Sequence, residues 1–411
     1  SSGFGFCDVI FGWDIADVLY DNATVTGWHT GYPDAHAVLD LSTLRPIPWE
    51  PNTVAILADF RDENGAHHPA CPRSTLRRVI ERAAALGFEA KLSCEFEFFL
   101  FEETPRSLHE KRFASLTPLS PGMFGYSWVR EGQNKELMAA ILDGMRAFDI
   151  EIEGLHTETG PGVYEVAIRY DDALRAADKA ALFKVAMKQI AYERGLSVTF
   201  MAKWNAELPG SSGHLHQSLW KGGKSAFSDP AAKDGMSQTM RHYVGGQVAL
   251  MPEMTALYSP TINSYKRYVP GVWAPLTATW GFENRTCAIR IIGAGSPYAT
   301  RVEYRQTAAD INPYVAMAAC LGAGLWGIEN RIEPPPPVQG DAGEGSAGDA
   351  ERRPLPRTLA EATRLLQGSE AARAVLGEAF VDHYVRTRAW EVRQYERAVT
   401  DWELRRYFEA V

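Results

Sequence analysis

The sequence predicts an α+β fold in which a small open sheet, residues 1–70, precedes a larger body, residues 71–411. The first part holds short β-rich runs between turn residues, namely Cys7–Phe11, Val18–Tyr20, Ala37–Leu41 and Thr53–Leu57. After Cys71-Pro72, apolar residues recur at helical spacing, as at Leu76, Val79, Ile80 and Ala83. Strand-like runs then alternate with helical patterns over 134–148 and 171–195, which predicts a sheet backed by helices.

The last third of the chain adds a buried helix, a loop and terminal helices. Val315–Ile328 is an apolar run of 14 residues, too short for a bilayer crossing of roughly 20 residues, so we expect a buried helix after Asn312-Pro313-Tyr314. Residues 331–357 are rich in Pro, Gly and acidic residues, which favours a flexible surface loop. Thr358 and Glu361 form a capping-box pattern for a helix that Gly368 can end.

Composition excludes some partners and favours a reduced compartment. With a net charge of −9 over 411 residues, the chain has no basic, aromatic-rich stretch for nucleic acid. Its five cysteines are widely spaced and form no Cys-x-x-Cys pair, so we expect free thiols. No signal peptide is recognisable. We therefore expect a cytoplasmic protein with neither a nucleic-acid nor a membrane partner.

Metal-ligand side chains recur at alternate positions of strand-like runs. Such pairs are Glu95 with Glu97 and His214 with His216, and single glutamates stand at Glu158, Glu165 and Glu303. In an extended strand residues i and i+2 point to one face, so each pair can line a common cavity while the residues between them pack behind. The pattern indicates that several hard ligands converge on one face of a sheet.

The ligand types point to divalent-metal chemistry on phosphates. Mg²⁺ and Mn²⁺ prefer oxygen ligands and accept imidazole, and two such ions roughly 4 Å apart can hold a phosphoryl group in transfer. Arginines that can bind carboxylate or phosphate oxygens accompany the glutamates; they are Arg267, Arg285, Arg290 and Arg305.

Seven motifs occur in an order that resembles the glutamine synthetase superfamily, over nearly the whole chain. They are Glu-Phe-Glu-Phe-Phe from Glu95, Glu-Thr-Gly-Pro-Gly-x-x-Glu from Glu158, Gly-Ser-Ser-Gly-His-Leu-His-Gln-Ser-Leu from Gly210, Asn-Ser-Tyr-Lys-Arg-x-Val-Pro-Gly from Asn263, Asn-Arg-Thr-x-x-x-Arg from Asn284, Arg-Val-Glu-x-Arg from Arg301 and Asn-Pro-Tyr from Asn312. The resemblance implies a β-grasp-like N-terminal domain and a catalytic domain with a curved antiparallel sheet backed by helices.

The resemblance also implies a role for individual residues. The metal near the amine and acid substrates would be held by Glu97, Glu158 and Glu165, and the metal that bridges the ATP phosphates by Glu95, His214 and Glu303. Glutamate would bind at Arg267, Arg305 and the backbone of Gly210. ATP would lie beside Arg285, Arg290, His216 and Ser218. Arg285 and Glu303 would also serve catalysis, with roughly two or three Mg²⁺ or Mn²⁺ ions per site. For His216, a core position is an open alternative.

Asp14 is the match to an aspartate that the family inserts into a neighbouring subunit's site to deprotonate the amine, and Asp17 is its competitor. The implied assembly is a stacked-ring decamer or dodecamer with active sites shared between subunits. The implied reaction transfers the γ-phosphate of ATP to glutamate, and an amine then displaces phosphate from the acyl phosphate.

Three departures bear on the substrates. Ammonia-using members that resemble this chain carry Pro-Gly-x-Glu-Ala-Pro in a mobile flap, whereas here Trp273 stands in Pro-Gly-Val-Trp-Ala-Pro. An indole favours an alkyl or aromatic substituent on the amine, although packing is the open alternative for Trp273. Val163 and Pro209 replace a usual Gln and Asn. We expect a γ-glutamyl-amine ligase; a true glutamine synthetase and a non-catalytic family member are the alternatives.

Overall fold

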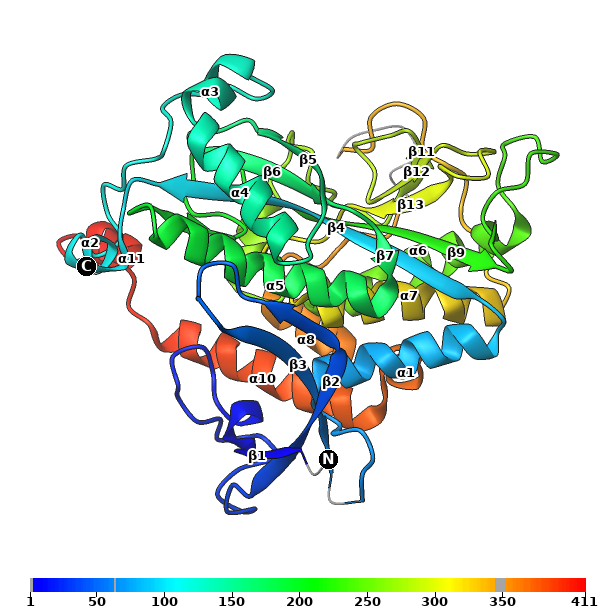
Figure 1. Ribbon diagram of the computed structural model, residues 1–411, viewed down its shortest axis with the longest axis horizontal. Helices are drawn as coiled ribbons and strands as arrows, with labels where there is room; N and C mark the ends of the chain where they lie inside the picture. The colour runs from blue at the N-terminus through cyan, green and yellow to red at the C-terminus, as the bar shows by residue number, and fades with distance from the viewer. Residues whose placement is uncertain (1–2, 63, 344–351) are drawn as a thin grey trace.

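The computed structural model describes residues 3–62, 64–343 and 352–411. Its N-terminal part contains an antiparallel sheet in the order β1-β2-β3, with β1 at Phe4–Cys7, β2 at Asp34–Pro46 and β3 at Val54–Arg61. Figure 1 shows this sheet on the opposite side of a helical layer from the large sheet. The mixed α+β class is confirmed, whereas the grasp-like arrangement of the small sheet stays a prediction.

Two of the strands predicted in this part do not form as expected. The strand ends at Cys7, and Asp8–Phe11 is a 3₁₀ turn, η1, that closes locally through the hydrogen bond from the Gly12 N–H to the Val9 carbonyl. Residues 18–20 contribute only an isolated bridge between Trp13 and Leu19. Backbone groups that have no neighbouring strand in reach find hydrogen-bond partners within their own segment, so the segment does not form a strand.

The large sheet runs in the order β11-β12-β13-β9-β4-β6-β5, with β7, β8 and β10 paired off this path. Its strands are β4 Glu89–Phe101, β5 Ile152–Thr157, β6 Val163–Ile168, β7 Asp171–Asp172, β8 Ser197–Thr199, β9 Gly213–Lys221, β10 Lys224–Ser225, β11 Trp280–Phe282, β12 Ile289–Ile292 and β13 Arg301–Tyr304.

The prediction of an antiparallel sheet is wrong for one pair, because β11 and β12 run parallel. The turn closed by the hydrogen bond from the Cys287 N–H to the Asn284 carbonyl carries the chain back. The Ile289 N–H then bonds the carbonyl of Thr279, just before β11. Because the chain returns to the starting end before β12 begins, the two strands share one direction.

Helices cover one face of the large sheet (Figure 1). This layer holds α5 (Ala173–Tyr192), α6 (Gln238–Tyr258) and α7 (Pro313–Glu329), with α1 (Pro72–Ala85) alongside. The predicted buried helix is α7, and the Asn312 side chain caps it by accepting the N–H groups of Tyr314 and Val315. Glycine lets α6 and α7 approach closely, since a Cβ on Gly246 would lie 2.2 Å from the Ala323 carbonyl oxygen.

The alternation predicted for β4 occurs as expected. Phe96 stacks on Phe183 of α5 with ring centroids 5.9 Å apart, and Phe98 packs on Phe200 at 5.6 Å. Both phenylalanines are fully buried. Glu95 and Glu97 therefore project to the other face of the sheet, which the helical layer leaves open.

The remaining helices flank this core. They are α2 (Pro105–Glu110), α3 (Trp128–Gln133), α4 (Lys135–Ala147), α8 (Leu359–Gly368), α9 (Glu370–Leu376), α10 (Glu378–Arg397) and α11 (Asp401–Tyr407). The helices predicted over 134–148 and 171–195 correspond to α4 and α5. At α8, Thr358 accepts the Glu361 N–H as predicted, but Glu361 accepts the N–H of Arg357 rather than that of Thr358.

The segment predicted as a flexible loop, 331–357, has its centre, 344–351, outside the described residues. One described flank runs along β11: the Val338 N–H bonds the Trp280 carbonyl at 2.8 Å, and the Trp280 indole bonds the Pro335 carbonyl at 2.6 Å. The flexibility of the segment stays a prediction. All five cysteines are free thiols, as expected. Among the described helices, none combines the length and the apolar character that a bilayer crossing requires.

Candidate active site

Strand register brings the predicted ligands together on the open face of the large sheet. β4 lies between β9 and β6, and it pairs Glu95 with His214 on one side and Glu97 with Glu165 on the other. β13 pairs Glu303 with His216 of β9. Ligands from four strands thus converge, because the two residues of each pair lie directly opposite each other on neighbouring strands.

One group of ligands forms around Glu95 and Glu303. Nδ1 of His214 lies 3.0 Å from Glu95 and 3.4 Å from Glu303, and Nε2 of His216 lies 3.6 Å from Glu95. Burial would raise the pKa of Glu95, but the two imidazoles hold it well below its usual range. Burial likewise opposes ionisation of Glu303, yet His214 and Arg305 lower its pKa to about 2. Both carboxylates are therefore charged at neutral pH.

A second group lies at the β5–β6 side. Nε2 of His156 is 3.1 Å from Glu165, and Nδ1 is 3.9 Å from Glu158. The contact with Glu165 raises the pKa of His156 to about 9, and burial raises that of Glu165. The Tyr126 ring stacks on His156 with centroids 4.7 Å apart. The positive charge of the imidazole thus offsets part of the carboxylate charge of this group.

Glu97 faces the same region but is held by the backbone. Its carboxylate accepts the Ser212 N–H at 2.5 Å, and its own N–H bonds the Ser212 carbonyl. It stays close enough to Glu165 for its charge to raise the pKa of that residue. Glu97 thus lies on the same acidic face, but it belongs to none of the compact groups of possible metal ligands among the described residues.

The donor sets fit divalent cations. Three triads place one ligand atom from each member within 4.8 Å of one another, and they comprise Glu95, His216 and Glu303; Glu95, Glu165 and His214; and His156, Glu158 and Glu165. Carboxylate oxygen with imidazole nitrogen is a donor set that Mg²⁺ tolerates and Mn²⁺ accepts readily.

Arginines border the glutamate cluster on the β12–β13 side. Arg305 donates to Glu303 at 2.5 Å, and Arg290 bridges Glu303 at 3.1 Å and Glu283 at 2.7 Å. Arg285 has an exposed side chain, and its backbone carbonyl accepts the Nε–H of Arg305 at 3.1 Å, which places it next to this group. Phosphate or carboxylate oxygens at this edge would meet several guanidinium groups.

Arg267 and Gly210 adjoin each other. Arg267 is 5% exposed and donates to the carbonyls of Arg305 and Gln306. A Cβ on Gly210 would lie 2.6 Å from the Ala202 carbonyl oxygen and 2.9 Å from Cγ of Arg267, so a larger residue would have to displace both. The charge of Glu97 also acts on this guanidinium.

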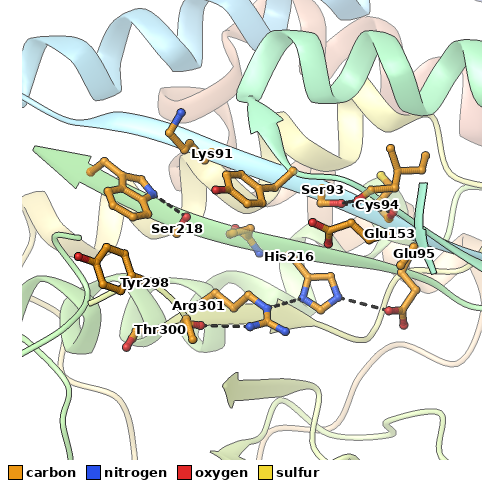
Figure 2. Close-up of a pocket in the computed structure, with 16 residues that line it drawn as sticks. Lys91, Ser93, Cys94, Glu95, Glu153, His216, Ser218, Tyr298, Thr300 and Arg301 are labelled. Atoms are coloured by element: carbon orange, nitrogen blue, oxygen red, sulfur yellow. Dashed lines mark hydrogen bonds and ion pairs between the residues drawn. The ribbon is translucent and has the colours of Figure 1, made fainter. Parts of the chain in front are cut away.

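A cavity of about 340 Å³ extends from Glu95 along β9 (Figure 2). His216 and Arg301 lie at its centre, with Nε of Arg301 3.3 Å from Nδ1 of His216. Ser218 and Tyr298 lie at the end away from Glu95. The His216 ring lines the cavity and lies 3.6 Å from Glu95, and its role beside the nucleotide stays a prediction.

Trp273 and Asp14 lie outside this cluster. The Trp273 side chain is 68% exposed, so it does not pack in the core of this chain. Asp14 belongs to the N-terminal part, where Oδ1 accepts the N–H groups of Ala16 and Val18 and Oδ2 accepts the indole N–H of Trp390. These hydrogen bonds outweigh burial and lower the pKa of Asp14. The structure ties Asp14 to α10 rather than to the glutamates of the same chain.

Sequence reasoning missed His156, Arg301 and Tyr126. His156 precedes Glu158 by two residues on β5, and Arg301 precedes Glu303 by two on β13. Both repeat the i, i+2 pattern that singled out Glu95 and Glu97, so the pattern could have found them. Tyr126 lies in a loop before α3, and no comparable pattern marks it.

Comparisons with known proteins agree with this geometry. The family model "Glutamine synthetase, catalytic domain" matches residues 69–407. A type-1 glutamine synthetase 2 from Dictyostelium discoideum is 49% identical, over 100% of this chain and 78% of the relative. A glutamate–isopropylamine ligase from Pseudomonas sp. is 41% identical over 100% and 89%, and a gamma-glutamylethanolamide synthetase from Streptomyces coelicolor is 39% identical over 98% and 85%.

Among solved structures, that of a GmaS/ADP complex superposes with a TM-score of 0.85 at 29% identity, covering 99% of this chain and 90% of the other. The fold and the carboxylate-rich sheet define an ATP-dependent carbon–nitrogen ligase that uses divalent metal, as this family generally does. The chain belongs to the glutamine synthetase family, in the branch that contains γ-glutamyl-amine ligases.

Proposed function

We propose that this enzyme joins the γ-carboxylate of glutamate to an organic amine. The observation that carries the proposal is Trp273: a large apolar side chain stands exposed where ammonia-using members carry a flap glutamate. A carboxylate attracts ammonium, whereas an indole contributes apolar area and one N–H donor. Two relatives near 40% identity are named for isopropylamine and ethanolamide products, which supports an organic amine here as well.

In this proposal Glu95, His214 and Glu303 hold one divalent cation, and Glu97, Glu158 and Glu165 hold another. When bound, such cations neutralise phosphate charge and orient the γ-phosphate. The chain's own Arg285 and Arg290 stabilise the charge that develops in transfer, while His216, Ser218 and Arg301 line the ATP cavity. Arg267, Arg305 and the Gly210 backbone hold glutamate with its γ-carboxylate toward the phosphate.

The second step needs a base for the protonated amine. We assign it to Asp14, contributed by a neighbouring subunit, with the site completed in a stacked-ring decamer or dodecamer. The own-chain hydrogen bonds of Asp14 keep it ionised, as a proton acceptor requires. Its lowered pKa also makes it a weak base, which leaves exposed Asp17 as the competing residue.

Ammonia is the second candidate substrate. The relative at 49% identity is named a glutamine synthetase, and that name favours ammonia as the nitrogen donor. A non-catalytic role is opposed by the presence of all six predicted metal ligands: five lie on paired strands of the large sheet, and Glu158 lies beside Glu165 and His156.

The test measures phosphate release from ATP with Mg²⁺ or Mn²⁺ and glutamate. Ammonia is compared with alkylamines, polyamines, ethanolamine and anilines at equal concentrations of free base. Strong stimulation by one organic class, with little by ammonia, supports the proposal and names the substrate. Stimulation by ammonia alone makes the enzyme a glutamine synthetase. The absence of both, together with no metal-dependent protection by ATP in thermal unfolding, supports the non-catalytic alternative.

A further inference from the structure

Arg267 is the last residue of the 3₁₀ turn η2, Asn263–Arg267, and backbone carbonyls hold its guanidinium. Two of its N–H groups bond the carbonyls of Arg305 and Gln306 at 3.2 and 3.1 Å. A guanidinium has five N–H donors, so it has donors beyond those used in these two bonds. The position of this arginine therefore depends on what holds η2.

The carboxylate of Asp310 holds this turn. Its Oδ2 accepts the hydroxyl of Thr261 at 2.8 Å and that of Ser264 at 2.7 Å. The same two residues also bond each other, because the Ser264 N–H donates to Thr261 Oγ1 at 3.1 Å. One carboxylate oxygen thus fixes both the residue before η2 and a residue within it. The other oxygen, Oδ1, is buried and makes no hydrogen bond to the described residues.

Lys184 of α5 holds Asp310 in turn. Its Nζ donates to the carbonyls of Ala309 and Ile311, at 2.5 and 2.7 Å, on either side of Asp310. The same ammonium lies 4.8 Å from the ring centroid of Phe96 and 5.3 Å from that of Phe200. Phe96 is the β4 residue between Glu95 and Glu97, so the ammonium sits directly behind the ligand-bearing strand.

We propose that Asp310 and Lys184 are positioning residues for the acid substrate, because together they fix Arg267 relative to the glutamates of β4. Neither residue belongs to any of the seven motifs noted in the sequence. The inference rests on the proposed function, in which Arg267 binds the carboxylate of glutamate. The charge of the Lys184 ammonium offsets that of the buried Asp310 carboxylate. The hydrogen bonds of Asp310 Oδ2 go to the turn, and those of Lys184 go to the backbone on either side of Asp310.

The test uses Asp310→Ala, Asp310→Asn and Ser264→Ala in the full chain. Asp310→Asn keeps an oxygen acceptor for the two hydroxyls, whereas Asp310→Ala removes it, and Ser264→Ala removes one donor. We expect the KM for glutamate to rise about 10-fold or more in Asp310→Ala and by about threefold or less in the other two variants. The KM for ATP and the metal requirement should change less than about twofold.

A second measurement keeps the inference testable if Asp310→Ala turns over slowly. Thermal unfolding in Mn²⁺ and ADP gives the glutamate concentration for half-maximal stabilisation, and Lys184→Met should shift it upward as Asp310→Ala does. Equal rises in the KM for glutamate and for ATP, or no rise in Asp310→Ala, would overturn the positioning role. If the wild-type enzyme shows no glutamate dependence at all, the proposed function fails instead.

Discussion

Nε2 of His156 lies 3.1 Å from the Glu165 carboxylate. The edge strand β5 thus contributes an imidazole to the acidic face, at the end of the strand order away from His214 of β9. His156 is placed either to bind a metal itself or to orient a carboxylate that binds one. In either role its removal weakens cation binding, because orienting partners typically contribute about 10- to 100-fold to metal affinity.

We expect His156→Asn to raise the Mn²⁺ concentration for half-maximal thermal stabilisation by about 10-fold or more. Exposed His29, which contacts the Thr24 carbonyl, gives the matched control His29→Asn, and that variant should bind Mn²⁺ as the wild type does. Equal Mn²⁺ midpoints for the two variants would exclude His156 from the metal site.

Glu303→Ala should abolish ATP turnover, with a loss of about a thousandfold or more. The change removes a predicted ligand and leaves Arg290 and Arg305 without the buried carboxylate that they share. The measurement is phosphate release at saturating metal. Exposed Glu333, which contacts His242, supplies Glu333→Ala as the control. Retention of most activity in Glu303→Ala would contradict the site assignment.

Trp273→Glu should shift preference toward ammonia. A carboxylate in the flap attracts ammonium and removes the apolar contact, so the ratio of kcat/KM for ammonia to that for the best organic amine should rise about 10-fold or more. Neighbouring Val272 is 49% exposed, and Val272→Glu tests whether added charge alone has this effect. An unchanged amine profile in Trp273→Glu would mean that Trp273 does not contact the amine.

The base for the amine can be identified by comparing two aspartates. We expect Asp14→Asn to lower kcat by about 10²- to 10⁴-fold and Asp17→Asn to have little effect. Because Asp14→Asn also alters the hydrogen bond with Trp390, Trp390→Phe serves as the control that loses this bond but keeps the carboxylate. A kcat loss in Trp390→Phe as large as in Asp14→Asn would indicate positioning alone, and a loss confined to Asp17→Asn would reassign the base.

Acid should destabilise the protein through His383. Burial, with the nearby charges of His68 and Arg388, lowers the pKa of His383 to about 4 from its usual 6.5. Its neutral form stabilises the fold above pH 6.5, and this contribution is lost as the pH falls toward 4. The loss amounts to at most about 3 kcal/mol in the free energy of unfolding.

Chemical unfolding of the wild type and of His383→Gln between pH 7 and 4.5 measures this contribution. The wild type should lose more stability over this range than the variant, in which the group cannot titrate. Parallel pH curves for the two proteins would show that His383 does not carry the acid sensitivity.

The predictions from sequence succeeded where the signal is local. Alternation along β4 placed Glu95 and Glu97 opposite Phe96 and Phe98, because strand geometry alone sends successive side chains to opposite faces. The α7 helix followed from an apolar run behind an Asn-Pro cap. The predictions failed where pairing is non-local, as at 8–11 and in the parallel pair β11–β12, since no local pattern states which strand is in reach.

The sequence by itself determined the kinds of ligand, their spacing on each strand and the family, because these depend on residue identity and order along the chain. Only the tertiary structure decided which ligands meet. It placed His156 beside Glu165 and directed the Glu97 carboxylate to the Ser212 N–H. It also placed Lys184 against the backbone next to Asp310, whose carboxylate bonds the turn that ends at Arg267. Those relationships arise from register between strands and from packing between distant segments, and neither is encoded in a single stretch of sequence.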